Sequence, residues 1–95
     1  MFRTERHHIT IEMYYVYVLE CLDRSLYIGY STNLKNRIES HNKGYNFSTK
    51  NKLPIKLIFY EAYLSKDDAK RREQYLKTTK GKTTLRTMLK DYLEN

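Results

Sequence analysis

The sequence predicts one small α+β domain, in which helices pack against a three-stranded, mainly antiparallel sheet in the order ββαβαα. Three observations favour this class. Two aromatic, β-branched runs flank a polar turn, segments with helical spacing follow them, and a third short apolar run lies between two of those helices. The 95 residues suffice for a single hydrophobic core. We expect an N-terminal extension over residues 1–12 and the domain itself over residues 13–95.

The first two strands are predicted over residues 14–19 and 26–30, where β-branched and aromatic side chains dominate. Side chains alternate along a strand, so the register of the pair decides which of them share a face. An odd-length turn loop places Tyr17 and Tyr27 on the same side of the sheet, whereas an even-length loop separates them. The sequence leaves both registers open.

A short helix is predicted next, with Thr32 or Asn33 as its N-cap and Gly44 in its C-cap. Arg37 and His41 are four residues apart, so they stand one turn from each other along one edge of this helix. The loop that follows contains lysines and aromatic residues but no acidic residue as far as residue 56. It is therefore predicted to be a basic surface loop.

The second half of the chain is predicted to contain one strand and two helices. Residues 57–60 are apolar on both faces, which predicts a strand that is central or well covered. Ser65 is the expected N-cap of the next helix, with acidic residues in the first turn. A turn is predicted around Gly81, and a final amphipathic helix carries apolar residues at i, i+3, i+4 and i+7, namely Leu85, Met88, Leu89 and Tyr92.

The composition favours a polyanionic partner. Eighteen Lys and Arg against eleven Asp and Glu give a formal net charge of +7, which favours nucleic acid, although a merely solvated basic surface fits the charge equally well. The single cysteine, Cys21, excludes an internal disulfide and indicates a reducing, cytoplasmic compartment. No apolar run approaches the roughly 18 residues of a membrane span, so we expect no membrane partner.

Glu73 is the most informative single residue of the second half. It lies on the apolar stripe between Ala69 and Leu76, and burial of an unpaired carboxylate costs several kcal/mol. Either a salt bridge to Arg72 or Lys77 compensates this charge, or a bound hard cation such as Mg²⁺ or Mn²⁺ does so. Both interpretations stay open on the sequence alone.

An ordered set of residues resembles the signature of the GIY-YIG nuclease family. The set consists of two short tyrosine motifs, a helical arginine and a late helical glutamate, which are Tyr15-Val16-Tyr17, Tyr27-Ile28-Gly29, Arg37 and Glu73. The resemblance spans residues 14–93 and is strongest to compact stand-alone members related to the N-terminal nuclease domain of the DNA-repair excinuclease. The first motif has Tyr-Val-Tyr where the family has Gly-Ile-Tyr. The family's late asparagine has no counterpart, and Thr83 or Thr84 is the candidate substitute.

The resemblance implies a metal-dependent endonuclease that hydrolyses DNA phosphodiester bonds, in DNA repair or recombination. Glu73 would be the only protein ligand of Mg²⁺ or Mn²⁺, and Tyr27 would be the general base, with Tyr17 holding the water or assisting. Arg37 would clamp the phosphate. His41 would orient the scissile phosphate or share the base role, unless it is an exposed histidine stabilised by the helix dipole.

The expected partner is DNA, structured or damaged, with specificity from this domain or from a partner protein. Backbone contacts are assigned to six basic residues, since phosphate contacts set affinity without reading sequence: Lys43, Lys50, Lys52, Lys80, Lys82 and Arg86. Tyr45 and Phe47 either stack on an unpaired base or fold back onto the domain. The alternative function is a non-catalytic nucleic-acid-binding domain with the nuclease fold, and a protein-interaction adaptor ranks third.

Overall fold

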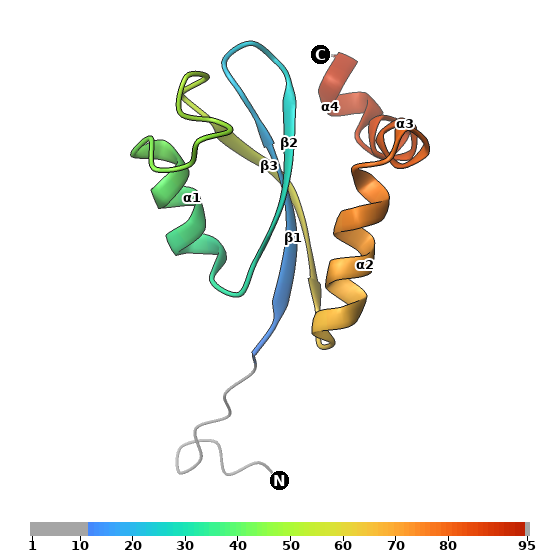
Figure 1. The fold of residues 1–95 in the computed structure, drawn as a ribbon. Helices are drawn as coiled ribbons and strands as arrows, with labels where there is room; N and C mark the ends of the chain where they lie inside the picture. Colours follow the sequence, from blue (N-terminus) through green and yellow to red (C-terminus); the bar gives the residue numbers. More distant parts are fainter. Residues whose placement is uncertain (1–11, 95) are drawn as a thin grey trace, which may run out of the picture.

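The computed structural model describes residues 12–94 and confirms the predicted α+β class (Figure 1). Its elements are β1 (Tyr14–Glu20), β2 (Leu26–Ser31), α1 (Leu34–Asn42), β3 (Lys56–Tyr63), α2 (Lys66–Leu76), α3 (Thr79–Met88) and α4 (Lys90–Glu94). The three strands form one antiparallel sheet in the spatial order β2-β1-β3. The predicted N-terminal extension, apart from its last residue, lies outside the described residues.

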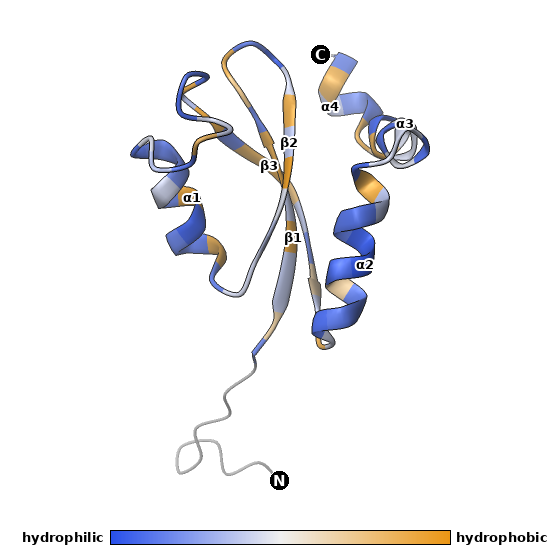
Figure 2. Ribbon diagram, in the orientation of Figure 1, coloured by the Kyte–Doolittle hydropathy of each residue, from blue (hydrophilic) through white to orange (hydrophobic). Residues whose placement is uncertain are grey.

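The domain has three layers, with α1 and its following loop on one face of the sheet and α2, α3 and α4 on the other (Figure 1). Hydrophobic residues concentrate in the strands, while α2 is hydrophilic over most of its length (Figure 2). Over residues 12–94, no helix has both the length and the apolar character needed to cross a membrane.

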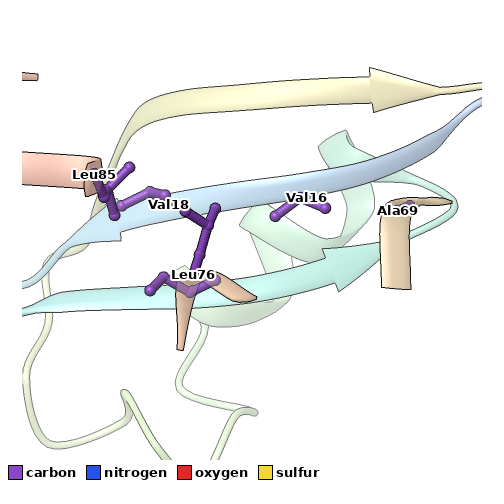
Figure 3. Close-up of a cluster of buried hydrophobic side chains, with 6 residues drawn as sticks. Val16, Val18, Ala69, Leu76 and Leu85 are labelled. Atoms are coloured by element: carbon purple, nitrogen blue, oxygen red, sulfur yellow. The ribbon is translucent and has the colours of Figure 1, made fainter. Parts of the chain in front are cut away.

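Strand β1 is buried on both faces because it lies in the middle of the sheet. Val16 and Val18 point to the α2 side, where they pack with Leu76 and Leu85 in an apolar core (Figure 3). The intervening Tyr17 points to the α1 side and is equally buried. The alternation of side chains along one strand therefore supplies two cores of different chemistry.

Strand β3 is an edge strand, so the prediction of a central position is wrong. Its side chains are half-buried or exposed along the whole strand. A bulge shifts the pairing, because Val18 lies opposite Phe59 while Leu19 lies opposite Leu57. Ile58 and Phe59 consequently both pack on the α2 side. Apolar residues on both faces thus indicate that layers cover the strand above and below, and they do not fix its lateral position in the sheet.

The β1–β2 register decides the question that the sequence left open. Residues 21–25 form a loop of odd length, and the pairing places Tyr17 opposite Gly29 and Leu19 opposite Tyr27. Directly opposed residues of an antiparallel pair project from the same face. Tyr17 and Tyr27 therefore share the α1 face.

Helix α1 begins and ends at the kinds of residue that the sequence predicted. The Asn33 side chain accepts a hydrogen bond from the Asn36 amide, and Gly44 follows the helix with a φ of 78°. Ser65 caps α2 in the same way through the Asp68 amide, at 3.2 Å. These local signals hold because caps depend on neighbouring residues only.

The C-terminal helices differ from the prediction in two ways. Gly81 lies in the first turn of α3 and not in a turn between helices. The Tyr75 carbonyl comes so close to it that no Cβ fits, which accounts for a glycine at this position. The predicted final helix is also divided at Leu89 into α3 and α4. Of its predicted apolar stripe, Leu85 is buried, whereas Met88 and Tyr92 are exposed.

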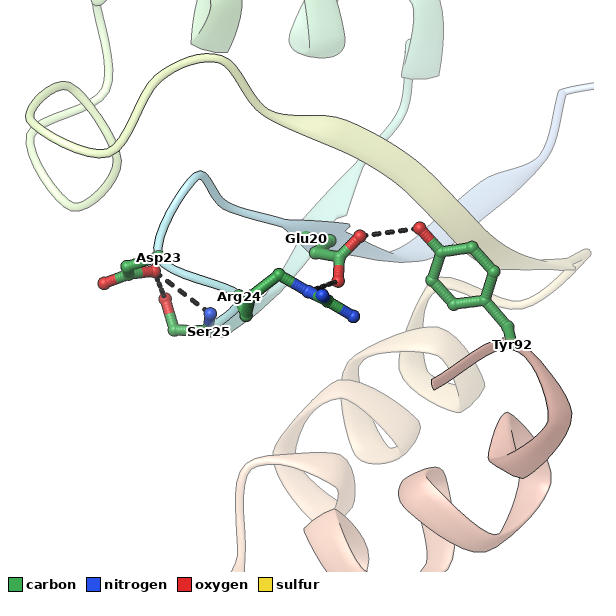
Figure 4. Close-up of polar contacts among 5 residues, drawn as sticks. All are labelled: Glu20, Asp23, Arg24, Ser25 and Tyr92. Atoms are coloured by element: carbon green, nitrogen blue, oxygen red, sulfur yellow. Dashed lines mark hydrogen bonds and ion pairs between the residues drawn. The ribbon is translucent and has the colours of Figure 1, made fainter. Parts of the chain in front are cut away.

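The turn end of the β1–β2 hairpin is tied to α4 by a polar cluster (Figure 4). Both Arg24 and the Tyr92 hydroxyl donate hydrogen bonds to the Glu20 carboxylate, each at 2.6 Å. The Tyr92 hydrogen bond, followed by that of Arg24, lowers the pKa of the Glu20 carboxyl group. Tyr92 therefore has a polar role at the helix end in place of the predicted apolar one.

Candidate active site

Tyr17 is the centre of a polar cluster on the α1 face. Its ring lies across Gly29 of the neighbouring strand, and a Cβ at Gly29 would collide with the phenol carbon and oxygen of Tyr17. The glycine of the second tyrosine motif therefore makes room for the tyrosine of the first. The two motifs therefore interlock across the β1–β2 pair.

His41 joins this cluster from the last turn of α1. Its Nε2 lies 2.9 Å from the Tyr17 hydroxyl oxygen, and its Nδ1 lies 2.8 Å from the hydroxyl oxygen of Thr49. The ring centroid is 5.8 Å from that of Tyr17 and 5.1 Å from that of Tyr27. His41 is fully buried, so the interpretation as an exposed helix-end histidine is wrong.

Arg37 lies one turn before His41 and is exposed. Its positive charge lowers the pKa of both Tyr17 and His41. The structure thus brings Tyr17, Tyr27, Arg37 and His41 together on one face of the sheet. An exposed guanidinium next to buried hydroxyl and imidazole groups is suited to hold an anionic oxygen against them.

The protonation states of Tyr17 and His41 follow from their burial. Burial is the largest cause of the raised pKa of the Tyr17 phenol, and Tyr27 raises it further. Arg37 opposes this rise but does not cancel it. Burial also lowers the pKa of His41, and the charge of Arg37 lowers it further. At neutral pH Tyr17 is therefore a neutral phenol and His41 a neutral imidazole.

Glu73 comes from α2, in the layer on the other side of the sheet. It is buried as predicted, and its Oε2 accepts a hydrogen bond from Lys77 Nζ at 3.0 Å. Arg72, the other predicted partner, instead forms a two-bond pair with Glu61. The Glu73 carboxylate contributes to the raised pKa of Tyr17, so it lies within electrostatic reach of the cluster.

The surroundings of Glu73 suit a cation that keeps most of its water ligands better than a cation that is enclosed by several protein ligands. No group of three or more His, Cys, Asp or Glu side chains that could hold a metal ion occurs within the described range of 12–94. Mg²⁺ needs only one or two carboxylates because it retains several waters. A single buried carboxylate, with a half-exposed lysine as its partner, is compatible with that mode of binding.

The six predicted DNA-contacting residues fall into two groups on opposite layers. Lys43, Lys50 and Lys52 belong to the loop after α1, and Lys52 also lies 3.8 Å from the Asp23 carboxylate. The other three belong to α3, where Lys82 and Arg86 line a cavity of about 220 Å³ against β2. The sequence could not separate these groups, because it does not show which face each helix covers.

The loop after α1, residues 43–55, presents its aromatic residues to solvent. Tyr45 is 75% exposed and Phe47 is 84% exposed, so the interpretation in which they fold back onto the domain is wrong. Lys50 Nζ lies 4.9 Å from the centroid of the Phe47 ring. The exposed side chains of this loop combine positive charge with an aromatic surface.

Thr49 is the site residue that sequence reasoning missed. It lies in the same loop but is fully buried against His41. Only the tertiary contact reveals it, because a threonine between a serine and a lysine in a polar loop carries no signal of its own. Thr83 and Thr84, the candidate substitutes for the late asparagine, both donate to carbonyls of the preceding turn of α3. Thr84 is in addition hydrogen-bonded to Tyr75.

Comparison with known proteins identifies the family. The model of the GIY-YIG catalytic domain matches residues 13–86, which is most of the chain. The chain belongs to the GIY-YIG family. Tyr17, Tyr27, Arg37, His41 and Glu73 all lie within the matched range.

Similar proteins share most of this GIY-YIG domain. The UPF0213 protein SpyM3_1077 of Streptococcus pyogenes serotype M3 is 41% identical over 79% of this chain and 83% of its own length. The UPF0213 protein SH2523 of Staphylococcus haemolyticus is 46% identical over 68% of this chain and 80% of its own length. The solution NMR structure of the UPF0213 protein BH0048 from Bacillus halodurans has a TM-score of 0.53 and 35% identity, and the match covers 80% of this chain and 84% of that one.

Proposed function

We propose that this GIY-YIG domain is a Mg²⁺- or Mn²⁺-dependent endonuclease that hydrolyses DNA phosphodiester bonds. The observation that carries the proposal is the buried Tyr17–His41 hydrogen bond, with Tyr27 and Arg37 beside it. Phosphodiester hydrolysis needs an attacking water, a group that accepts its proton, and positive charge on the phosphate. The cluster contains candidates for the proton acceptor and for the phosphate-binding charge.

Tyr27 is the proposed general base, and Tyr17 the proposed hydrogen-bond donor. The raised pKa of Tyr17 keeps it protonated, which suits a group that holds a water or a phosphate oxygen and does not suit a base. Tyr27 is half-buried beside His41 and is therefore the more accessible phenol. Arg37 is proposed to bind two non-bridging oxygens of the scissile phosphate through its planar guanidinium.

Glu73 is the proposed protein ligand of the cation. When bound, Mg²⁺ or Mn²⁺ supplies positive charge for the phosphoryl oxygens and lowers the pKa of a coordinated water. Lys77 neutralises Glu73 in the structure, so it is the group that a cation at this carboxylate would replace. Its half-exposed side chain can move into solvent at small cost.

The proposed substrate is structured or damaged DNA, as in repair or recombination, with a partner protein as a further source of specificity. Support comes from the net charge of +7 and from the loop of residues 43–55, where lysines adjoin exposed aromatic rings. Such rings stack on unpaired bases with little regard to sequence. The basic residues of α3 extend the proposed contact surface to the other layer.

A non-catalytic nucleic-acid-binding domain is the second candidate. The observation that favours it is the Glu73–Lys77 ion pair, since this pair satisfies the buried carboxylate without a metal. In that case the fold and the basic surface would serve binding alone.

One assay separates the two functions. Purified protein is incubated with branched, nicked and unmodified duplex DNA in Mn²⁺, and the same reactions are repeated in EDTA. Cleavage in Mn²⁺ that disappears in EDTA supports the endonuclease, and the preferred DNA identifies the substrate structure. Binding to all three DNAs without cleavage in either condition supports the second candidate and contradicts the first.

A further inference from the structure

Thr49, His41 and Tyr17 form a buried chain of two hydrogen bonds that begins in the loop of residues 43–55. The Thr49 hydroxyl lies 2.8 Å from Nδ1 of His41, and Nε2 lies 2.9 Å from the Tyr17 hydroxyl. All three side chains are fully buried. Among the residues that the structure describes, the Thr49 hydroxyl has no other hydrogen-bond partner than His41.

The hydrogen-bonded series Thr49–His41–Tyr17 contains one more proton than it has hydrogen bonds. A neutral imidazole carries one N–H, and each hydroxyl carries one O–H, which makes three protons for two bonds. One hydroxyl proton must therefore point out of the chain. It points outward from Thr49 if Tyr17 donates to His41, and it points outward from Tyr17 if Thr49 donates to His41.

The hydroxyl groups of Thr49 and Tyr17, at the two ends of this hydrogen-bonded series, differ in the acceptors that are available to an outward-pointing proton. At Thr49 the described residues offer no further acceptor, and an unpaired buried donor is costly. At Tyr17 the exposed Arg37, which stands one turn from His41 on α1, acts on the phenol with its positive charge. An anionic oxygen that Arg37 binds consequently arrives beside the Tyr17 hydroxyl and accepts its proton.

We propose that Thr49 is a positioning residue that donates to Nδ1 of His41, so that Nε2–H donates to Tyr17 and the Tyr17 O–H points to a phosphodiester oxygen held by Arg37. In this arrangement each of the three protons has an acceptor, namely Nδ1 of His41, the Tyr17 oxygen and the phosphodiester oxygen. Only a side chain with a hydroxyl can complete it at position 49. The inference rests on the proposed function, because it names the phosphodiester as the outer acceptor.

The arrangement also connects the DNA-contacting loop to the site. Thr49 directly precedes Lys50, and the exposed Phe47 is two residues away. The exposed side chains of this loop are the proposed DNA contacts, and its buried threonine forms the hydrogen bond to His41. We expect contacts at the loop surface and the orientation of His41 to depend on the same backbone segment.

The first test is ¹⁵N NMR of the histidine side chains in the full chain, with a short duplex DNA in EDTA so that the DNA stays intact. His41 is assigned by comparison with His41→Gln. We expect a directly bonded proton on Nε2 and the shift of a hydrogen-bonded, unprotonated nitrogen on Nδ1. The hydrogen-bond signature at Nδ1 should persist in Thr49→Ser and vanish in Thr49→Val. A proton on Nδ1 of the DNA-bound wild type overturns the proposal, whether or not the protein cleaves DNA.

The second test is single-turnover cleavage in Mn²⁺ by the same variants. Thr49→Val keeps the shape but loses the hydroxyl, and it should lower the cleavage rate constant about tenfold at unchanged DNA affinity. Thr49→Ser should restore most of that rate. Equal rates for the valine variant and the wild type overturn the positioning role. If the valine variant does not fold, the wild-type NMR spectrum decides the question. Absence of any wild-type cleavage contradicts the proposed function and this cleavage role, while the NMR result still stands on its own.

Discussion

The two faces of the sheet are both buried, but they are built from different chemistry. On the α2 face, Val16, Val18, Leu76 and Leu85 form a core of hydrocarbon side chains. The α1 face instead buries the hydroxyl of Tyr17 and the ring of His41, and their polar atoms are hydrogen-bonded. A core that needs only stability has no reason to bury groups that each require a partner. The α1 face also contributes an apolar cluster with Leu19 and Ile55, and we infer that its additional hydrogen-bonded polar groups belong to the candidate site.

Glu73 is the exception on the α2 face, and its replacement should have the largest effect on activity. Glu73→Gln removes the proposed ligand of the cation while keeping side-chain volume. We expect metal-dependent cleavage to fall below detection, since no second carboxylate ligand is predicted, and we expect DNA binding in EDTA to remain. Cleavage rates in Mn²⁺ and binding by fluorescence anisotropy check both statements.

Lys77→Gln is the matched control for this prediction. It removes the partner of a buried carboxylate, which should cost a few kcal/mol of stability, but it leaves the carboxylate itself in place to bind the cation. Lys77→Gln should therefore retain cleavage. If instead both variants lose stability and activity to the same degree, Glu73 has a structural role as an ion-pair partner and is not the metal ligand.

Leu76→Ala should have the largest effect on stability. Leu76 is fully buried in the hydrocarbon core, and such truncations cost about 2–5 kcal/mol, because they remove apolar contacts and leave a cavity. Urea denaturation followed by circular dichroism measures the change. Leu34→Ala, at a half-buried position on the α1 face, is the comparison and should cost less. Equal losses at the two positions would remove the distinction between the faces.

The acid side of the stability profile should report on His41, with a smaller effect. Burial, aided by Arg37, lowers the pKa of His41 in the fold, so the unfolded chain binds a proton first as the pH falls. The stabilising contribution is complete above the unfolded pKa of about 6.5 and is lost as the pH falls from there toward the lowered folded pKa. His41→Gln should flatten the unfolding free energy between pH 7 and pH 5. An unchanged slope in that variant would assign the pH dependence to other groups.

Local features of the fold were predictable from the sequence, because they depend on neighbouring residues. The cap residues Asn33 and Ser65 and the burial of Glu73 belong to this class. The lateral position of β3 was not predictable, because coverage by layers and pairing within a sheet are independent. Gly81 was misplaced for a related reason, since its close neighbour is the carbonyl of Tyr75 at the end of another helix.

The candidate site divides in the same way. The tyrosine motifs, Arg37 and Glu73 have order and spacing that a sequence displays. The burial of His41 became visible only with the structure, as did its bond to Thr49, because both depend on how the loop of residues 43–55 packs against α1. The interlock between Tyr17 and Gly29 likewise required the strand register.

The most direct test of the central claim compares two tyrosines of the same strand, one on each face. Tyr27 lies beside His41, whereas Tyr30 packs on the α2 side, and its buried hydroxyl has no hydrogen-bond partner among residues 12–94. Single-turnover cleavage in Mn²⁺ is measured for Tyr27→Phe and Tyr30→Phe. We expect Tyr27→Phe to lose about 10²–10⁴-fold in rate, as for removal of a general base, and Tyr30→Phe to cut like the wild type. Normal cleavage by Tyr27→Phe, or an equal loss in both variants, would contradict the assignment of catalysis to the α1 face.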